Sequence, residues 1–225
     1  MAENQTLPGP PSPRTEVKRG AIRADYAPGT VESILDAGFV CHVACAVDGA
    51  AFVIPMIYAR LGEELLLHGS TGNRVMRVLQ SGAIATVSVM HCDGLVLSRS
   101  AFHHSVNYRS VTIYGQAREL EGPEKDKALS AFVEVVAPGR SDDCRPPNAE
   151  ELRRTMVLAI PLAEASAKHR NQGPLEEEDD WDLPYWAGVV PLETTRGAPI
   201  PCERLAAGAE LPAYLDRPGA PLRIR

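Results

Sequence analysis

The sequence of 225 residues is poor in aromatic side chains, which make up 5% of the chain. Proteins that bind single-stranded nucleic acids use aromatic platforms for stacking, so this composition disfavours that function. The formal net charge is −6, from 23 basic and 29 acidic residues. Because no excess of positive charge is present, we expect no nucleic-acid partner.

The acidic excess lies in one segment. It comes from six residues close together, namely Glu176, Glu177, Glu178, Asp179, Asp180 and Asp182. Without them, 23 acidic residues (29 − 6) balance the 23 basic ones. The sequence therefore predicts one acidic surface loop on an otherwise balanced protein.

Cysteine pairs, signal peptides and long apolar runs are also lacking. The five cysteines form no C-x-x-C pair, which favours neither a disulfide framework nor a zinc site. Cys41 and Cys45 lie in an apolar run and are expected to be buried as small hydrophobic residues. No run reaches about 18 apolar residues, and the N-terminal stretch lacks the apolar core of a secretory signal. We expect a cytoplasmic protein with no membrane partner and no bound metal.

The chain divides into three parts by composition. Residues 1–16 are rich in proline and predict a disordered leader. Residues 17–200 predict one globular domain, and residues 201–225 a proline-rich C-terminal arm.

Within the domain, short apolar and β-branched stretches separated by turn signals predict about seven or eight strands. Asp48-Gly49 and Asp93-Gly94 are typical two-residue hairpin turns. Most strands therefore follow one another as antiparallel hairpins. This order indicates a mainly β fold, an antiparallel barrel with peripheral α-helices.

Helical spacing of apolar residues appears in a few segments between the strands. The segment 21–40 predicts a helix with Thr30 as N-cap and Gly38 as its end. Further helices are expected at 75–81, at 122–138 and at 149–154.

The segment GSTGNR, residues 69–74, predicts a site for a single phosphate. Its small residues are expected to leave backbone N–H groups accessible at the start of a helix, and Ser70, Thr71 and Arg74 add hydroxyl groups and a cation. The segment lacks the Lys-Ser/Thr ending of a nucleoside-triphosphatase loop. An ordinary strand-to-helix connection is the alternative.

The histidines predict no metal site. The pair His103-His104 has no third partner at ligand spacing, and His42 is expected to be a core residue of an apolar strand. In His91-Cys92-Asp93, neighbouring strand residues point to opposite faces. His68 differs, because it ends a strand directly before the predicted phosphate loop.

Three segments together resemble the pyridoxamine 5′-phosphate oxidase-like superfamily, closest to its nitroimidazole-resistance branch. They are VIPMIYARLGEELLLHGSTGNR, DGLVLSRSAFHHSVNYRSVTIYGQARELEG and LPYWAGVVPLE, in this order along the chain. The resemblance covers residues 15–200. It implies a split β-barrel of the FMN-binding type and a homodimer with FMN at the interface.

The resemblance also implies roles for residues of this chain. The backbone of the strand that contains Pro55, Met56, Ile57 and Tyr58 would run along the flavin ring. Phosphate and ribityl contacts would come from His68, Gly69, Ser70, Asn73 and Arg74. Further flavin contacts would come from Arg109, Ser110, Val111, Lys168 and Trp186. His68 would also be the catalytic residue, since an imidazole can carry a proton near neutral pH.

These roles predict an FMN-dependent oxidoreductase with a small-molecule substrate, a nitro-aromatic compound or another small electrophile. The tail lacks the arginine-histidine-arginine element that true pyridoxamine phosphate oxidases use for their substrate, which disfavours vitamin B6 synthesis. Two alternatives stay open. One is a haem-binding split barrel that uses His103 or His104, and the other is a flavin-binding regulator or store without turnover.

Overall fold

The computed structural model describes residues 8–220, and ten strands form one sheet within them. The strands are β1 Ala24–Asp25, β2 Val40–Val47, β3 Ala50–Leu61, β4 Glu64–Ser70, β5 Ile84–Leu97, β6 Ser105–Gln116, β7 Arg118–Glu119, β8 Thr155–Pro161, β9 Ala165–Arg170 and β10 Gly188–Pro191. Their order is β1-β9-β6-β5-β2-β3-β4-β8-β7, with β10 on β5, and every pairing is antiparallel. The predicted mainly β, split-barrel fold is confirmed.

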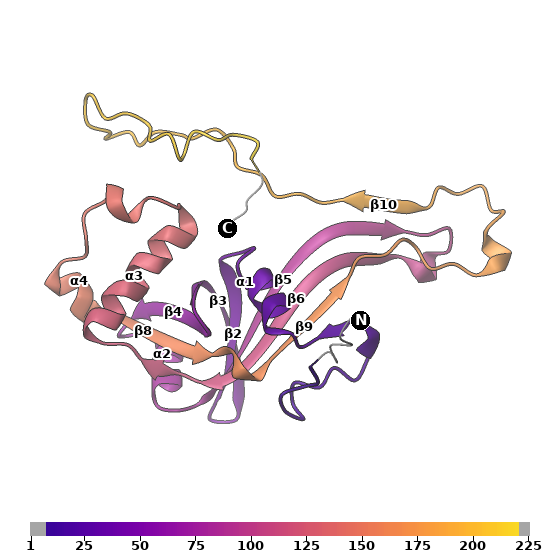
Figure 1. Cartoon of the computed structure of the whole chain (residues 1–225), viewed down its shortest axis with the longest axis horizontal. Helices are drawn as coiled ribbons and strands as arrows, with labels where there is room; N and C mark the ends of the chain where they lie inside the picture. Colours follow the sequence, from indigo (N-terminus) through magenta and orange to yellow (C-terminus); the bar gives the residue numbers. More distant parts are fainter. Residues whose placement is uncertain (1–7, 221–225) are drawn as a thin grey trace, which may run out of the picture.

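The helices lie around this sheet (Figure 1). They are α1 Pro28–Leu35, α2 Arg74–Gln80, α3 Gly122–Val136 and α4 Ala149–Arg154, with 3₁₀ turns η1 Ala21–Arg23, η2 Ala101–His103, η3 Ser141–Asp143, η4 Leu162–Glu164 and η5 Glu178–Asp180. The last three predicted helices are confirmed. The first is shorter than expected, because Pro28 begins it after Ala27 and the hydroxyl of Thr30 binds Asp25 instead of capping a helix.

Apolar side chains fill two layers. The barrel interior holds residues from α1, α2 and most strands, among them Leu35, Val43 and Leu67. Cys41 and Cys45 are buried there, as predicted. A second cluster lies between α3 and the other face of β3, β4 and β8, around Leu66 and Phe132. His42 faces outward and is exposed, so its prediction as a core residue was wrong.

Strand β5 corrects another expectation. Asp93-Gly94 does not turn the chain, because β5 runs on to Leu97 and only shifts its register with β6 between Cys92 and Gly94. The shift is a β-bulge, a feature that re-aims side chains near sites. The turn into β6 lies later, around η2. Figure 1 shows the resulting long β5/β6 hairpin reaching out from the barrel, with β10 beside it.

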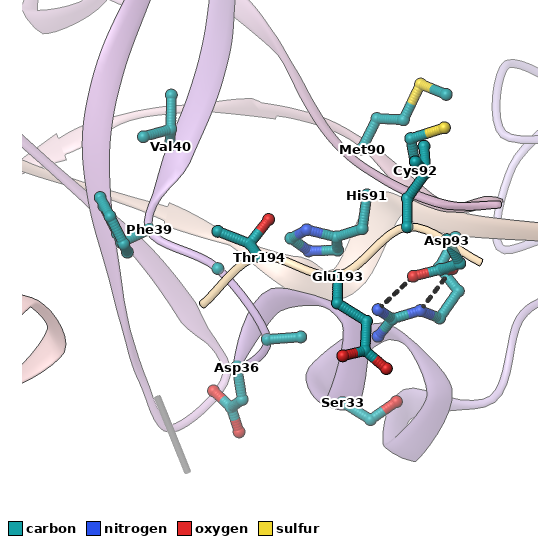
Figure 2. Close-up of a pocket in the computed structure, with 14 residues that line it drawn as sticks. Ser33, Asp36, Phe39, Val40, Met90, His91, Cys92, Asp93, Glu193 and Thr194 are labelled. Carbon is teal, nitrogen blue, oxygen red and sulfur yellow. Dashed lines mark hydrogen bonds and ion pairs between the residues drawn. The ribbon is translucent and has the colours of Figure 1, made fainter. Parts of the chain in front are cut away.

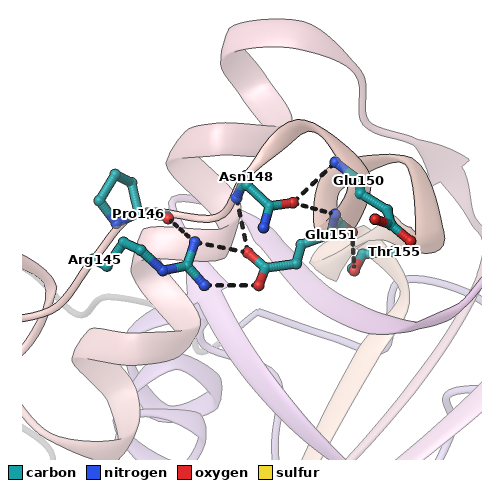
Figure 3. A network of polar contacts seen from close by, with 6 residues as sticks. All are labelled: Arg145, Pro146, Asn148, Glu150, Glu151 and Thr155. Carbon is teal, nitrogen blue, oxygen red and sulfur yellow. Dashed lines mark hydrogen bonds and ion pairs between the residues drawn. The ribbon is translucent and has the colours of Figure 1, made fainter.

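The hairpin turn at Asp48-Gly49 is confirmed, since both residues adopt positive φ, 51° and 78°. Helix α4, by contrast, is fixed by side chains (Figure 3). Asn148 accepts hydrogen bonds from the amides of Glu150 and Glu151, and the carboxylate of Glu151 accepts one from the amide of Asn148. Hydrogen bonds from Arg145 and from that amide lower the pKa of Glu151 to about 2. This cap sets the start of β8, which pairs with β4.

Candidate functional site

The register of the sheet brings several predicted site residues into one row on its outward face. Lys168 pairs with Ser110, Ser110 with Met90, and Val40 with Ile57. His42 pairs with Ser88, and two residues further along these strands are Val40 and Met90. Tyr58 pairs with Leu67, and the next residues along these strands are Ile57 and His68. When the last two pairings are extended to these residues, the registers give one row across β9, β6, β5, β2, β3 and β4. Its members are Lys168, Ser110, Met90, Val40, Ile57 and His68.

The middle of this row is apolar and uncovered. Val40 is 49% exposed, Ile57 39% and Met90 57%, and Val53 on the same face is 61% exposed. Pro55, opposite His42 in the register, is exposed beside them. Contiguous exposed apolar surface of this kind marks a binding or association site.

The two ends of the row are far apart. Neighbouring strands lie about 4.8 Å from each other, so His68 on β4 and Lys168 on β9 are separated by roughly 24 Å along the sheet. They also lie on an outward face, from which side chains diverge. One planar ring therefore cannot touch both ends within one chain, and the predicted site consists of two halves.

The strand β3 offers the predicted half-site mainly its backbone. The hydroxyl of Tyr58 donates to the carbonyl of Leu35 at 2.6 Å in the core, where burial raises the pKa of Tyr58. Met56 points toward the core cluster as well. β4 pairs with β3 only from Tyr58 onward, so in the described chain residues 50–57 have a strand on one edge alone. That free edge fits the expected contact between backbone amides and a flat ring.

The loop at residues 69–74 differs from the expected phosphate cradle. The amides of Thr71, Gly72 and Asn73 bind the Arg154 carbonyl, the Ser70 hydroxyl and the Ser70 carbonyl at 3.1, 3.2 and 2.9 Å. The expectation that this loop exposes free N–H groups was wrong for these three. The side-chain oxygen of Asn73 caps α2 by accepting from the amides of Val75 and Met76.

Arg74 is the accessible cation of this loop. Its guanidinium lies 4.6 Å from the ring centroid of Phe52 and 3.9 Å from the carboxylate of Asp48. Both side chains of this ion pair are well exposed, at 61% and 91%. A pair with this geometry is weak, so the guanidinium is available to an anionic ligand.

The side chain of His68 forms no hydrogen bond with any residue that the structure describes. Its Nδ1 is buried and unpaired within the described chain, and its ring lies 4.3 Å from that of Phe132 on α3. Burial lowers the pKa of His68 and favours the neutral imidazole. An unpaired buried polar atom is rare and calls for an explanation such as a ligand or a catalytic role.

The predicted residues of β6 point in different directions. Val111 is fully buried in the core. Ser110, on the outward face, donates to the carbonyl of Lys168 at 3.1 Å, and Nζ of Lys168 donates to the carbonyl of Arg19. Arg109 lies on the opposite face and forms two hydrogen bonds with Asp93, which raise the pKa of Arg109.

Trp186 and the paired histidines lie away from the row. Trp186 is 65% exposed ahead of β10, which runs beside the distal part of β5. At the hairpin end, His103 lies 3.5 Å from Glu177, and Nδ1 of His104 lies 3.1 Å from the carbonyl of Ser100. Among the residues described, no three ligand-type side chains gather as a metal site would require.

A pocket of about 1050 Å³, which the sequence did not predict, lies beside the row (Figure 2). It lies between the end of α1, the bulge of β5 and the segment after β10, and its walls include Val40, His91, Asp93, Arg109 and Glu193. Nε2 of His91 donates to the carbonyl of Ile34 at 2.9 Å. Gly38 makes room for this ring, because a Cβ there would lie 2.4 Å from its Cε1. The sequence signal for this pocket is Gly38, which the sequence predicts only as the end of a helix.

Residues 28–169 match the family model described as "Pyridoxamine 5'-phosphate oxidase". The chain belongs to this family. The match covers the split barrel and ends at β9, so β10 and the segment after it lie beyond the family region. No curated protein matches the chain.

Two solved structures resemble nearly the whole chain. The flavocytochrome Anf3 from Azotobacter vinelandii is 36% identical over 92% of this chain and 97% of its own, with a TM-score of 0.87. The FAD and haem binding protein from Mycobacterium smegmatis is 34% identical over 89% and 99%, with a TM-score of 0.85. A 5-nitroimidazole antibiotic resistance protein from Bacteroides thetaiotaomicron VPI-5482 is 19% identical, covers 64% and 85%, and shares the fold with a TM-score of 0.53. In the described residues, no helix is long and apolar enough to cross a membrane.

Proposed function

We propose that the protein is a flavin-dependent oxidoreductase that works as a homodimer. The observation that carries the proposal is the outward row, whose exposed apolar centre joins the two halves of the predicted site. Two similar solved structures are named for a flavocytochrome and for FAD and haem binding, which supports a flavin here. A bound flavin supplies reversible electron transfer, and the protein supplies orientation and electrostatics.

Each half of the site has a separate task in this proposal. Ile57 and Pro55 offer an apolar surface for the flat ring, and Arg74 binds the phosphate. His68, kept neutral by burial, holds or moves a proton at a ring nitrogen. In a two-fold dimer, Ser110 and Lys168 of one protomer lie beside Ile57 and His68 of its partner, which completes the site.

FMN, the predicted cofactor, and FAD share the ring and the first phosphate. The name of the Mycobacterium smegmatis relative, which mentions FAD, favours this dinucleotide as the alternative. The experiment is to purify the full chain, record its absorbance spectrum, release the cofactor with acid and measure its mass. Paired flavin bands with the mass of FMN or FAD support the proposal. A colourless protein that does not take up either nucleotide contradicts it.

Haem is the second candidate cofactor, because the two similar structures are named for a flavocytochrome and for FAD and haem binding. A neutral imidazole would hold haem iron, and burial favours the neutral form of His68. His103 and His104, the earlier candidates, already contact Glu177 and the Ser100 carbonyl. A Soret band that disappears in His68→Ala and persists in His103→Ala with His104→Ala supports this assignment. The reverse pattern assigns haem binding to His103 or His104 at the hairpin end.

The proposed substrate is a small electrophile such as a nitro-aromatic compound, as the resemblance implies. A regulator or store without turnover is distinguished by kinetics. Reduced, flavin-loaded protein is mixed with nitro-aromatic acceptors and with oxygen. Reoxidation that is faster than that of free flavin supports an oxidoreductase, and equal rates support a store.

A further inference from the structure

The pocket beside the row is a gap in the sheet. Strands β2 and β10 both pair with the same edge of β5, β2 up to Ser88 and β10 from Gly94. Between them, β5 has β6 on its other edge and no strand on this one in the described part of the chain. Residues 90–93 of this stretch line an opening of about 1050 Å³. This is at the upper end of the volumes that small-molecule sites have.

The walls of the gap are apolar where the two flanking strands end. Phe39 and Val40 stand at the start of β2, and Leu192 follows β10, with its amide bound to the Asp93 carbonyl at 3.0 Å. A flat molecule placed between these ends faces the free edge of β5. It takes the place that a continuous strand occupies elsewhere in the sheet, where backbone groups bind their neighbours.

Of the three carboxylates in the pocket walls, two are paired with arginines, and Glu193 is unpaired among the described residues. Asp36 is held by Arg60, and Asp93 by Arg109, each through two hydrogen bonds. Glu193 has no hydrogen bond or ion pair with any described residue. Figure 2 shows its carboxylate directed toward Ser33, at the end of α1. The C-terminal end of that helix adds partial negative charge.

We propose that this gap is a second ligand site, and that it takes a planar organic cation, an aromatic ring with an amine or amidine group. The ring lies between Val40 and Leu192, and the cationic group binds Glu193. Glu193 belongs to the segment beyond the family region, so the charge selectivity of the site is a property of that extension. Because Val40 and Met90 belong to both the gap and the row, the ligand lies beside the proposed flavin. Its role as a substrate therefore rests on the proposed function.

The test uses the full chain as purified, with its cofactor content measured first. Benzamidine, a flat amidinium, is titrated calorimetrically, with the neutral benzamide and the anionic benzoate as matched probes. We expect benzamidine to bind at least tenfold more tightly than benzoate. Equal affinities for benzamidine and benzoate, or no binding of benzamidine, overturn the proposal.

Variants locate the bound cation. Glu193→Gln keeps the shape of the side chain and removes its charge, and Glu210→Gln is the control on the same segment, outside the pocket. We expect about a tenfold loss of benzamidine affinity in the first variant and none in the second. An equal response of both variants overturns the site.

The same titration separates the two proposals. Benzamidine binding that depends on Glu193 in a protein without flavin supports the gap and contradicts the proposed function. Flavin-loaded protein that does not bind benzamidine supports the proposed function and contradicts the ligand site in the gap. Displacement of flavin by benzamidine places the probe on the row and also overturns the gap.

Discussion

Arg109 on β6 donates two hydrogen bonds to Asp93 on β5, from Nε to Oδ2 at 2.9 Å and from Nη2 to Oδ1 at 2.8 Å. The bulge in β5 makes this contact possible, because it lies at Asp93 itself. Arg109 was predicted to contact the cofactor, yet two of its donors are already used. It points to the pocket side of the sheet, away from Ser110.

The ion pair leads to the first prediction. Arg109→Ala should lower the free energy of unfolding by about 0–1 kcal/mol, because both partners are partly exposed. Flavin affinity, measured by fluorescence titration, should fall less than it does in Arg74→Ala. A larger loss of affinity in Arg109→Ala means that a ligand displaces Asp93 and that the predicted contact exists.

Arg74→Ala should weaken flavin binding. One charge-assisted phosphate contact contributes roughly 1.5–3 kcal/mol, or about 10- to 150-fold in the dissociation constant. Arg153→Ala is the matched control, since Arg153 is an exposed arginine on α4 without an ion pair in the described chain. An unchanged dissociation constant in Arg74→Ala would refute the phosphate site.

His68→Gln should keep flavin bound and reduce turnover per bound flavin by about 10²-fold or more, because glutamine forms hydrogen bonds but cannot act as an acid or base. Normal turnover with a lowered melting temperature would assign His68 a structural role.

The same variant should change how stability depends on pH. Burial lowers the pKa of His68 below 6.5, so the unfolded chain takes up this proton first as the pH falls. The native protein therefore loses stability below about pH 6.5, and the loss levels off only below the folded-state pKa. Denaturant unfolding at several pH values should show a smaller loss in His68→Gln than in the wild type. Equal losses would contradict the burial of the imidazole.

The dimer should depend on the exposed face of β3. Val53→Glu places a charge on the exposed apolar face beside the row, so we expect light scattering to show a shift toward monomers, together with loss of flavin. Ile22→Glu is the control, since Ile22 is an exposed apolar residue on η1, outside the row. A wild-type monomer that holds flavin stoichiometrically would contradict the composite site.

Gly38→Ala should destabilise the protein by about 1–3 kcal/mol, because the new methyl group meets the ring of His91. His91→Ala in the same chain should recover most of this loss, although it removes the bond to Ile34. A double-mutant cycle in denaturant measures the coupling. Additive effects would show that the ring simply moves away.

The sequence by itself determined the elements that depend on neighbouring residues. The apolar runs, the Asp48-Gly49 turn and the helical spacing at 122–138 specified a mainly β fold, since turn chemistry and periodicity act over short distances. The motif order specified the family. Local rules failed where two outcomes share one signal, as at Asp93-Gly94, which fits a turn or a bulge.

The tertiary structure alone decided which of these residues meet. Lys168 and Ser110 face each other only because β9 and β6 pair in one register, and a shift of one residue would turn either side chain to the other face. Burial decided that Tyr58 binds the Leu35 carbonyl and that Nδ1 of His68 forms no hydrogen bond within the described chain. The gap between β2 and β10 depends on where two distant strands stop along β5, which is set by long-range pairing and not by any local pattern.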